Sequence, residues 1–266
     1  MFTKEDIFHQ LEDMNAPRKG VVLVHTSLRA VGEVEGRGEG LLEVLIEYFT
    51  KKGGLLCIPT HTWANIGDEN KITLDMKEGK TCIGTLPDIA AKHPKAYRTH
   101  HPTHSMAVFG QKKKVDKFVL HEDMQITPTP PMGCYGKLYE EGHVLLIGVG
   151  HERNTYLHAV EEMLGVPNRI SKEPKKITIL FANGDFVTDY VHVHESEGIP
   201  HVSEHFPKYE PAFRYHGAIV DGKIGNASTQ LCNAKLMHAI MTQIRDRSGR
   251  IELCADDTPL DEAWYK

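Results

Sequence analysis

Residues 143–164 constrain the fold most, because they join a buried strand to a helix across a glycine-rich turn. The apolar run 144–147 stands between two glycines, which is typical of a central strand covered on both faces. Asn154 or Thr155 is able to cap the helix that follows, in which apolar residues recur at helical spacing. Open α/β sheets bind their ligands where strands end and helices begin, so this stretch predicts a site at that edge.

His158 and Glu161 fall on this expected helix and are three residues apart, so they share one of its faces. A histidine beside a carboxylate is a candidate general base with the acid that orients it. The plainer interpretation is a core histidine satisfied by a carbonyl group, next to a glutamate in solvent. The two residues by themselves leave both interpretations open.

The rest of the chain alternates between strand and helix signals, the pattern of βαβ units. An Asn-Gly turn between 177–181 and 186–194 predicts a hairpin, and a second hairpin is expected around 220–223. The other expected strands are 21–24, 55–59 and 106–109, the expected helices are 41–50, 83–93, 112–121 and 233–246, and residues 64–82 are expected to form a loop. We therefore predict an α/β chain, a single α/β/α domain over residues 1–266 with a mixed, mostly parallel central sheet.

Composition narrows the class of protein. Five widely spread cysteines without a CxxC pair favour a reduced, cytoplasmic compartment. A formal net charge of −5 argues against nucleic acid as a partner. No stretch approaches the roughly 20 apolar residues of a membrane span, and the amphipathic N-terminus does not read as a signal peptide.

Five blocks of sequence, in their order and at their distances, resemble the aminoglycoside 3-N-acetyltransferase family, also called antibiotic N-acetyltransferases. The blocks are 22–32, 58–63, 97–110, 144–161 and 222–231, and together they span most of the chain. Two blocks are the most specific, and their matching residues are Arg98, Thr99, His101, Pro102 and Ser105 in one and Asn154, Thr155, His158 and Glu161 in the other.

The resemblance implies an acyltransferase whose fold is distinct from the GNAT acetyltransferases. It would move an acetyl group from acetyl-CoA to a primary amine of an aminoglycoside or a related amino-sugar-like substrate, without a required metal. The family is associated with antibiotic resistance, and whether this chain confers it stays open. His158 would be the catalytic base, which suits an imidazole of pKa near 6.5, and Glu161 would orient it. A homodimer is compatible with the resemblance.

The resemblance also implies which residues bind the two substrates. The coenzyme would lie along one loop and part of the 97–110 block, with the residues His25, Thr26, Ser27, Leu28, Arg29, Val31, Gly32, Arg98, Thr99 and Ser105. The amine would contact His61, Trp63, His192, His194 and Glu195.

The chain departs from the family at one strand. Where the family carries two carboxylates in an Asp-x-Asp pattern, this chain has His192 and His194, so the identity of the acceptor amine stays open. Alternating histidines near Glu195, His201 and His205 also suit a zinc site, although the spacing matches no standard zinc signature. A metal-dependent hydrolase, or a non-catalytic small-molecule-binding relative with a histidine-rich site, is therefore the alternative function.

Overall fold

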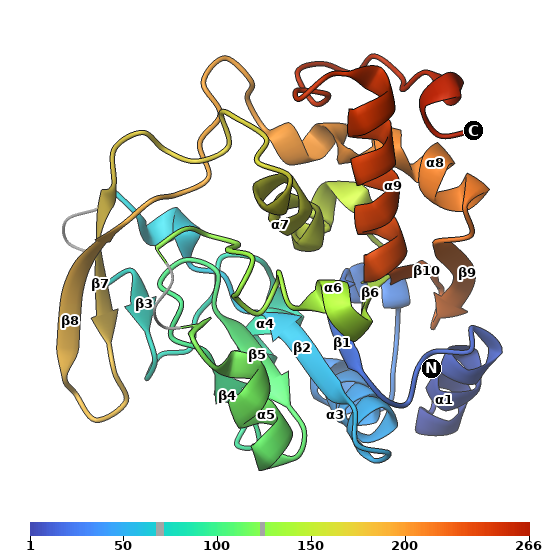
Figure 1. The fold of residues 1–266 in the computed structure, drawn as a ribbon. Helices are drawn as coiled ribbons and strands as arrows, with labels where there is room; N and C mark the ends of the chain where they lie inside the picture. Colours follow the sequence, from blue (N-terminus) through green and yellow to red (C-terminus); the bar gives the residue numbers. More distant parts are fainter. Residues whose placement is uncertain (68–71, 123–125) are drawn as a thin grey trace.

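A seven-stranded sheet forms the centre of the computed structural model, which describes residues 1–67, 72–122 and 126–266 (Figure 1). Its strands lie in the order β4-β5-β2-β1-β6-β10-β9. Their bounds are Val21–Thr26 for β1, Leu55–Pro59 for β2, Tyr97–Arg98 for β4, Met106–Phe109 for β5, Gly142–Ile147 for β6, Ile219–Ile224 for β9 and Ala227–Asn233 for β10.

The centre of this sheet is parallel and its flanks are antiparallel. β1 pairs in parallel with β2 on one side and with β6 on the other. The pairs β2–β5, β4–β5, β6–β10 and β9–β10 are all antiparallel. The mixed α/β sheet is confirmed, but its parallel part is limited to three strands, which is less than we expected.

Side chains of the central strands alternate between two buried cores, as the period of a strand requires. In β6, Val144 and Leu146 face one core, and Leu145 and Ile147 face the other. One core takes apolar residues from α1 (Lys4–Asp13), α2 (Leu28–Val31), α3 (Arg37–Thr50) and α4 (Thr85–Lys92). The opposite core takes them from α5 (Lys112–Val119), α6 (Leu138–Glu141), α7 (Thr155–Met163), α8 (Glu210–Tyr215) and α9 (Ala234–Ser248).

A second, three-stranded sheet stands beside the main one. It is formed by β3 (Leu74–Asp75), β7 (Lys175–Leu180) and β8 (Phe186–Val191). The hairpin β7–β8 is confirmed, and Figure 1 shows it at the left edge of the molecule, far from α9. β3 falls in the region 64–82 that we expected to be a loop, of which residues 68–71 lie outside the described part.

The second expected hairpin turns four residues later than predicted. Residues 220–223 lie inside β9, and the chain reverses at Gly225 and Asn226, where Gly225 has a φ of 59°. Gly222 serves packing instead, because a Cβ there would lie 2.2 Å from the Met14 side chain after α1. The Asp-Gly pair therefore resembled a turn, whereas its glycine is a point of close contact.

Four short 3₁₀ helices complete the described structure: η1 (Trp63–Asn65), η3 (His151–Arg153), η4 (Val202–Tyr209) and η5 (Glu262–Trp264). Within the ranges that the structure describes, no helix has the length and apolar character needed to cross a membrane.

Candidate functional site

A cavity of about 770 Å³ opens at the carboxyl ends of the three parallel strands. Its wall includes Thr26 at the end of β1, Pro59 at the end of β2, and Val149 just after β6. The N-terminal half of α7 and the segment 193–203 close the other sides. The edge of the sheet predicted from residues 143–164 is therefore where the molecule is hollow.

Helix α7 brings His158 to this cavity. Asn154 caps the helix, because its side chain accepts a hydrogen bond from the backbone N–H of Tyr156 at 3.2 Å. His158 follows one turn later, lines the cavity, and packs its ring against Phe206 with ring centroids 4.8 Å apart. Its Nδ1 is buried and has no hydrogen-bond partner among the described residues.

A row of imidazole rings continues from His158 across the cavity. His158 stacks on His194 with centroids 4.3 Å apart and an interplanar angle of 30°. His194 contacts His104 at 5.0 Å, and His104 contacts His61 at 4.4 Å. The far end is fixed by a hydrogen bond of 2.5 Å between Nε2 of His61 and the hydroxyl of Tyr135.

Burial holds these imidazoles in their neutral form. The pKa values of His61, His104 and His158 lie well below the ordinary 6.5, first because of burial and then because of neighbouring positive charge. Burial likewise lowers the pKa of His194 to about 4 and that of His25, in the cavity wall, to about 3. A neutral imidazole has a free lone pair, so His158 is able to accept a proton at neutral pH.

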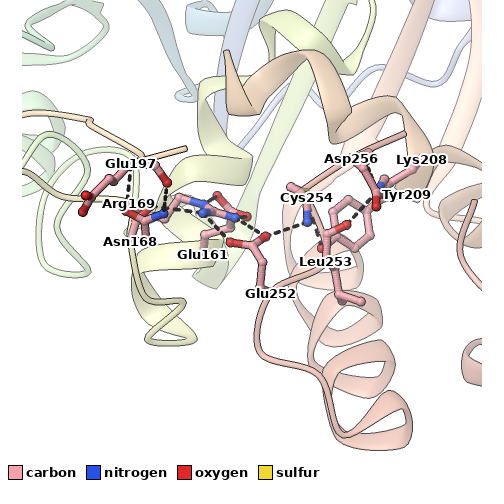
Figure 2. Close-up of polar contacts among 10 residues, drawn as sticks. All are labelled: Glu161, Asn168, Arg169, Glu197, Lys208, Tyr209, Glu252, Leu253, Cys254 and Asp256. Atoms are coloured by element: carbon pink, nitrogen blue, oxygen red, sulfur yellow. Dashed lines mark hydrogen bonds and ion pairs between the residues drawn. The ribbon is translucent and has the colours of Figure 1, made fainter. Parts of the chain in front are cut away.

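The carboxylate of Glu161, which we expected to orient His158, is paired with Arg169. Its two carboxylate oxygens accept hydrogen bonds from Nε and Nη2 of Arg169, at 2.8 Å and 3.0 Å (Figure 2). It shares a face of α7 with His158, but the pair with Arg169 is the one that forms. Helical spacing therefore predicted that His158 and Glu161 are neighbours, but it did not predict the hydrogen-bond partner of the Glu161 carboxylate.

The expected coenzyme loop 25–32 lies partly at the cavity. His25 and Thr26 line its wall. Ser27 caps α2 by accepting a hydrogen bond from the N–H of Ala30 at 3.3 Å. Leu28, Arg29 and Val31 belong to α2, and Gly32 ends it with a φ of 82°. Ala30 of this short helix lines a second hollow, which shares Val149 and Glu152 with the cavity and continues along 226–230.

The other residues expected at the coenzyme are buried within the protein and do not line the cavity. Arg98 donates to the backbone oxygens of Asp75 and Thr60, at 3.2 Å and 3.3 Å. Thr99 accepts a hydrogen bond from the N–H of Met106, and Ser105 donates to the carbonyl of Thr60 at 2.8 Å. These hydrogen bonds join neighbouring strands, whereas Nε of Arg98 is buried without a partner among the described residues.

Four of the five residues expected to contact the acceptor line the cavity, namely His61, Trp63, His194 and Glu195. His192 does not, and its Nδ1 lies 2.7 Å from the carbonyl oxygen of Ser171. We expected His192 and His194 to share a strand face, but β8 ends at Val191, so strand alternation stops before them.

Several residues of the cavity wall were not expected there. Arg169 had no local signal, because it follows a turn and its partners lie 8 and 83 residues away. His104 lies within the 97–110 block but was not among the residues expected to contact a substrate. Further unexpected wall residues are Thr103, Glu152, Arg153, Ile199, Val202 and Ser203.

The histidine row does not have metal-site geometry. Within residues 1–67, 72–122 and 126–266, no group of three or more His, Cys, Asp or Glu side chains is arranged to hold a metal ion. The five thiols are free, and Cys82 is the one at the cavity wall.

The sequence of this chain is similar to those of known proteins. The sequence model of a family described as aminoglycoside 3-N-acetyltransferase matches residues 23–245. Aminoglycoside N(3)-acetyltransferase IV from Salmonella sp. is 28% identical over 240 residues, which covers 87% of this chain and 83% of the relative.

Solved structures agree with the sequence match. The apoenzyme of aminoglycoside acetyltransferase AAC(3)-IVa superposes with a TM-score of 0.77 at 27% identity, covering 95% of this chain and 91% of the other. A histidine-to-alanine variant of AAC(3)-IVa in complex with a gentamicin superposes with the same TM-score at 26% identity and the same coverage.

Proposed function

Because the chain belongs to the aminoglycoside 3-N-acetyltransferase family, we propose that it is an acyltransferase that moves the acetyl group of acetyl-CoA to a primary amine of an aminoglycoside or related amino sugar. The proposal rests on the family sequence model that matches residues 23–245, combined with a buried, neutral His158 in a cavity at the strand ends. A relative of the same fold has been solved with a gentamicin bound, which supports an aminoglycoside as the acceptor.

His158 acts as the general base of the proposed reaction. An ammonium group has no lone pair, so it first gives one proton to solvent, and the resulting neutral amine must lose a second proton as its nitrogen bonds to the thioester carbon. The neutral imidazole accepts that proton, the new C–N bond forms, and the C–S bond of the thioester breaks. The proton then goes to the departing thiolate, so that the acetylated amine and free CoA leave a neutral His158.

Thr26 is the proposed donor to the thioester oxygen. Negative charge develops on that oxygen in the transition state, and a hydrogen-bond donor placed there stabilises it. The buried hydroxyl of Thr26 lines the cavity and has no partner among the residues that the structure describes. Ser27 and Ser105 are less suitable, because Ser27 caps α2 and Ser105 bonds Thr60.

The two hollows supply a path for the coenzyme. We place the pantetheine arm of acetyl-CoA along the second hollow, so that the thioester passes Val149 and Glu152 into the cavity. The amine then enters from the side formed by Trp63, His194 and Glu195. Glu152 and Glu195 are the carboxylates on this wall, although Glu195 also lies 3.7 Å from the Lys175 ammonium group.

We further propose that the enzyme works in a reducing, cytoplasmic setting and without a metal. Its five free thiols support the first point. The second follows from a mechanism in which a base and a hydrogen-bond donor suffice.

A thiol-release assay tests the proposed function. The purified protein is incubated with acetyl-CoA and, in turn, gentamicin, simpler amino sugars and monoamines, and mass spectrometry identifies each acetylated product. We expect release of CoA together with an N-acetylated amino sugar. Absence of release with every amine, together with no measurable binding of CoA by calorimetry, would contradict the proposal.

A further inference from the structure

Arg169 is the most thoroughly paired charged side chain at the cavity. Its side chain is 4% exposed and meets two carboxylates, each in a two-point contact (Figure 2). Glu161 accepts at 2.8 Å and 3.0 Å, and Glu252 accepts at 2.8 Å and 2.7 Å. Such forked contacts fix the plane of a guanidinium group as well as its position.

Arg169 joins the two segments that carry the stacked rings of His158 and His194. On one side its guanidinium holds Glu161, one turn along α7 from His158. On the other side its backbone carbonyl accepts a hydrogen bond of 3.1 Å from the N–H of Glu195, next to His194. The geometry of the ring stack therefore depends on where Arg169 is held.

Glu252 holds Arg169 from the C-terminal segment. This segment lies beyond residue 245, where the match to the family sequence model ends. Glu252 also accepts a hydrogen bond of 2.7 Å from the N–H of Cys254. The ammonium group of Lys208 in η4 then fastens this segment by donating to the carbonyls of Leu253 and Asp256, at 2.6 Å and 2.5 Å. Figure 2 shows these contacts as one continuous chain from Glu161 to η4.

We propose that Arg169 is a positioning residue for acetyl transfer, and that Glu252 of the C-terminal segment holds it in the position that aligns His158 with His194. The inference rests on the proposed function, since the alignment matters to the reaction through His158. It adds a residue from outside the matched family region to the machinery of the site. Removing Glu252 leaves a buried guanidinium with one carboxylate, which then has room to tilt.

The network also acts on the protonation of His158. Glu161 shares its helix, and His194, His61, His104 and Arg169 are the titratable or charged groups near it on other segments. Arg169 lowers the pKa of His158, and Glu252 partly neutralises Arg169. Loss of the Glu252 charge therefore lowers the pKa of His158 further, so the acid limb of kcat moves to lower pH.

Glu252→Gln tests the proposal, because it removes the charge and keeps the size of the side chain. We expect kcat to fall about tenfold with KM for the amine nearly unchanged, since a small misplacement of a reacting group is costly. We also expect the acid limb of kcat to move to lower pH. Glu262→Gln is the matched control, since Glu262 is an exposed carboxylate near the same terminus, paired with Lys266, and we expect it to match the wild type.

A second variant and a second measurement keep the test decisive. Glu252→Asp keeps the charge and shortens the arm, so kcat should fall while the acid limb stays in place, even if Glu252→Gln does not fold. The chemical shifts of the His158 imidazole nitrogens, measured by NMR, report on the environment of the ring directly. We expect these shifts to change in Glu252→Asp but not in Glu262→Gln. Wild-type kcat and unshifted signals in folded Glu252→Asp would overturn the proposal. An inactive wild type would defeat the proposed function instead, and the NMR measurement would still decide whether Glu252 positions His158.

Discussion

At the scale of single residues, the site depends on imidazoles that are buried and uncharged. His61, His104, His158 and His194 form one row of rings, in which an added charge on any ring is opposed by burial and by its neighbours. The rings of such a row are neutral at neutral pH, so each keeps a nitrogen lone pair. Burial also makes each hydrogen bond to the row valuable, because a buried imidazole nitrogen that loses its partner is left unsatisfied.

Tyr135→Phe tests that value at the end of the row. The hydroxyl of Tyr135 is the partner of Nε2 of buried His61, at 2.5 Å. Its removal should lower the free energy of unfolding by about 1–3 kcal/mol, the cost of an unsatisfied buried group. Urea denaturation measures this, and Tyr190→Phe at an exposed tyrosine should stay within about 0.5 kcal/mol of the wild type. Equal stability of all three proteins would show that the bond contributes little.

The residue scale also marks what the sequence allowed us to predict. His158 was recognisable because a cap, a helix period and a preceding buried strand place it at a strand end. The partner of Glu161 was not recognisable from the sequence. The spacing of three residues shows that Glu161 and His158 are close, but not that Glu161 forms its ion pair with Arg169 instead. Arg169 follows a turn and binds the carboxylate of Glu161, and Glu252, 83 residues further along the chain, binds Arg169. No local sequence pattern predicts either contact.

At the scale of elements, apolar runs predicted the strands, and turn chemistry predicted only some of their connections. The Asn-Gly pair at 183–184 formed the expected hairpin because Gly184 takes the positive φ that such a turn needs. The Asp-Gly pair at 221–222 did not, because Met14 packs against Gly222. The antiparallel pairs β6–β10 and β2–β5 were not predicted, since pairing with a distant strand leaves no signal in either strand alone.

Arg98 connects elements, and its replacement separates a structural role from a coenzyme role. Arg98→Met removes the hydrogen bonds that join the end of β2 to β3, so the free energy of unfolding should fall by about 1–3 kcal/mol. KM for acetyl-CoA should stay within about twofold, since Arg98 does not line the cavity. Exposed Arg247→Met is the control for stability. A large rise in KM for acetyl-CoA in folded Arg98→Met would restore the coenzyme role that the resemblance implied.

At the scale of the whole molecule, two helical layers on one sheet leave the strand ends as the place where a cavity forms. Each central strand sends alternate side chains into one of two cores, so the sheet is rigid on both faces. Polar and titratable groups collect at its edge instead. The cavity therefore collects histidines whose protonation is unfavourable in the folded state. Protonating them lowers the free energy of unfolding of the whole domain.

Stability should accordingly fall as the pH falls below about 6.5. The unfolded chain takes up a proton on each histidine near its ordinary pKa of about 6.5, whereas the folded pKa values of His25, His61, His104, His158 and His194 lie well below it. Stability is therefore lost between the unfolded and the folded pKa values. Each group contributes about 1 kcal/mol between pH 7.5 and pH 5.5, so the five together contribute several kcal/mol. Urea denaturation at the two pH values checks this, and equal free energies of unfolding would contradict neutral burial.

The central claim is that His158 takes the proton from the attacking amine. Single-turnover transfer from acetyl-CoA, measured for His158→Ala and wild type at saturating amine, tests it most directly. Folding is checked by circular dichroism, and His192→Ala is the matched control, because His192 lies outside the cavity wall. We predict a rate constant about 10²–10⁴-fold lower for His158→Ala and an unchanged one for His192→Ala. A rate constant for folded His158→Ala equal to that of the wild type would contradict the account.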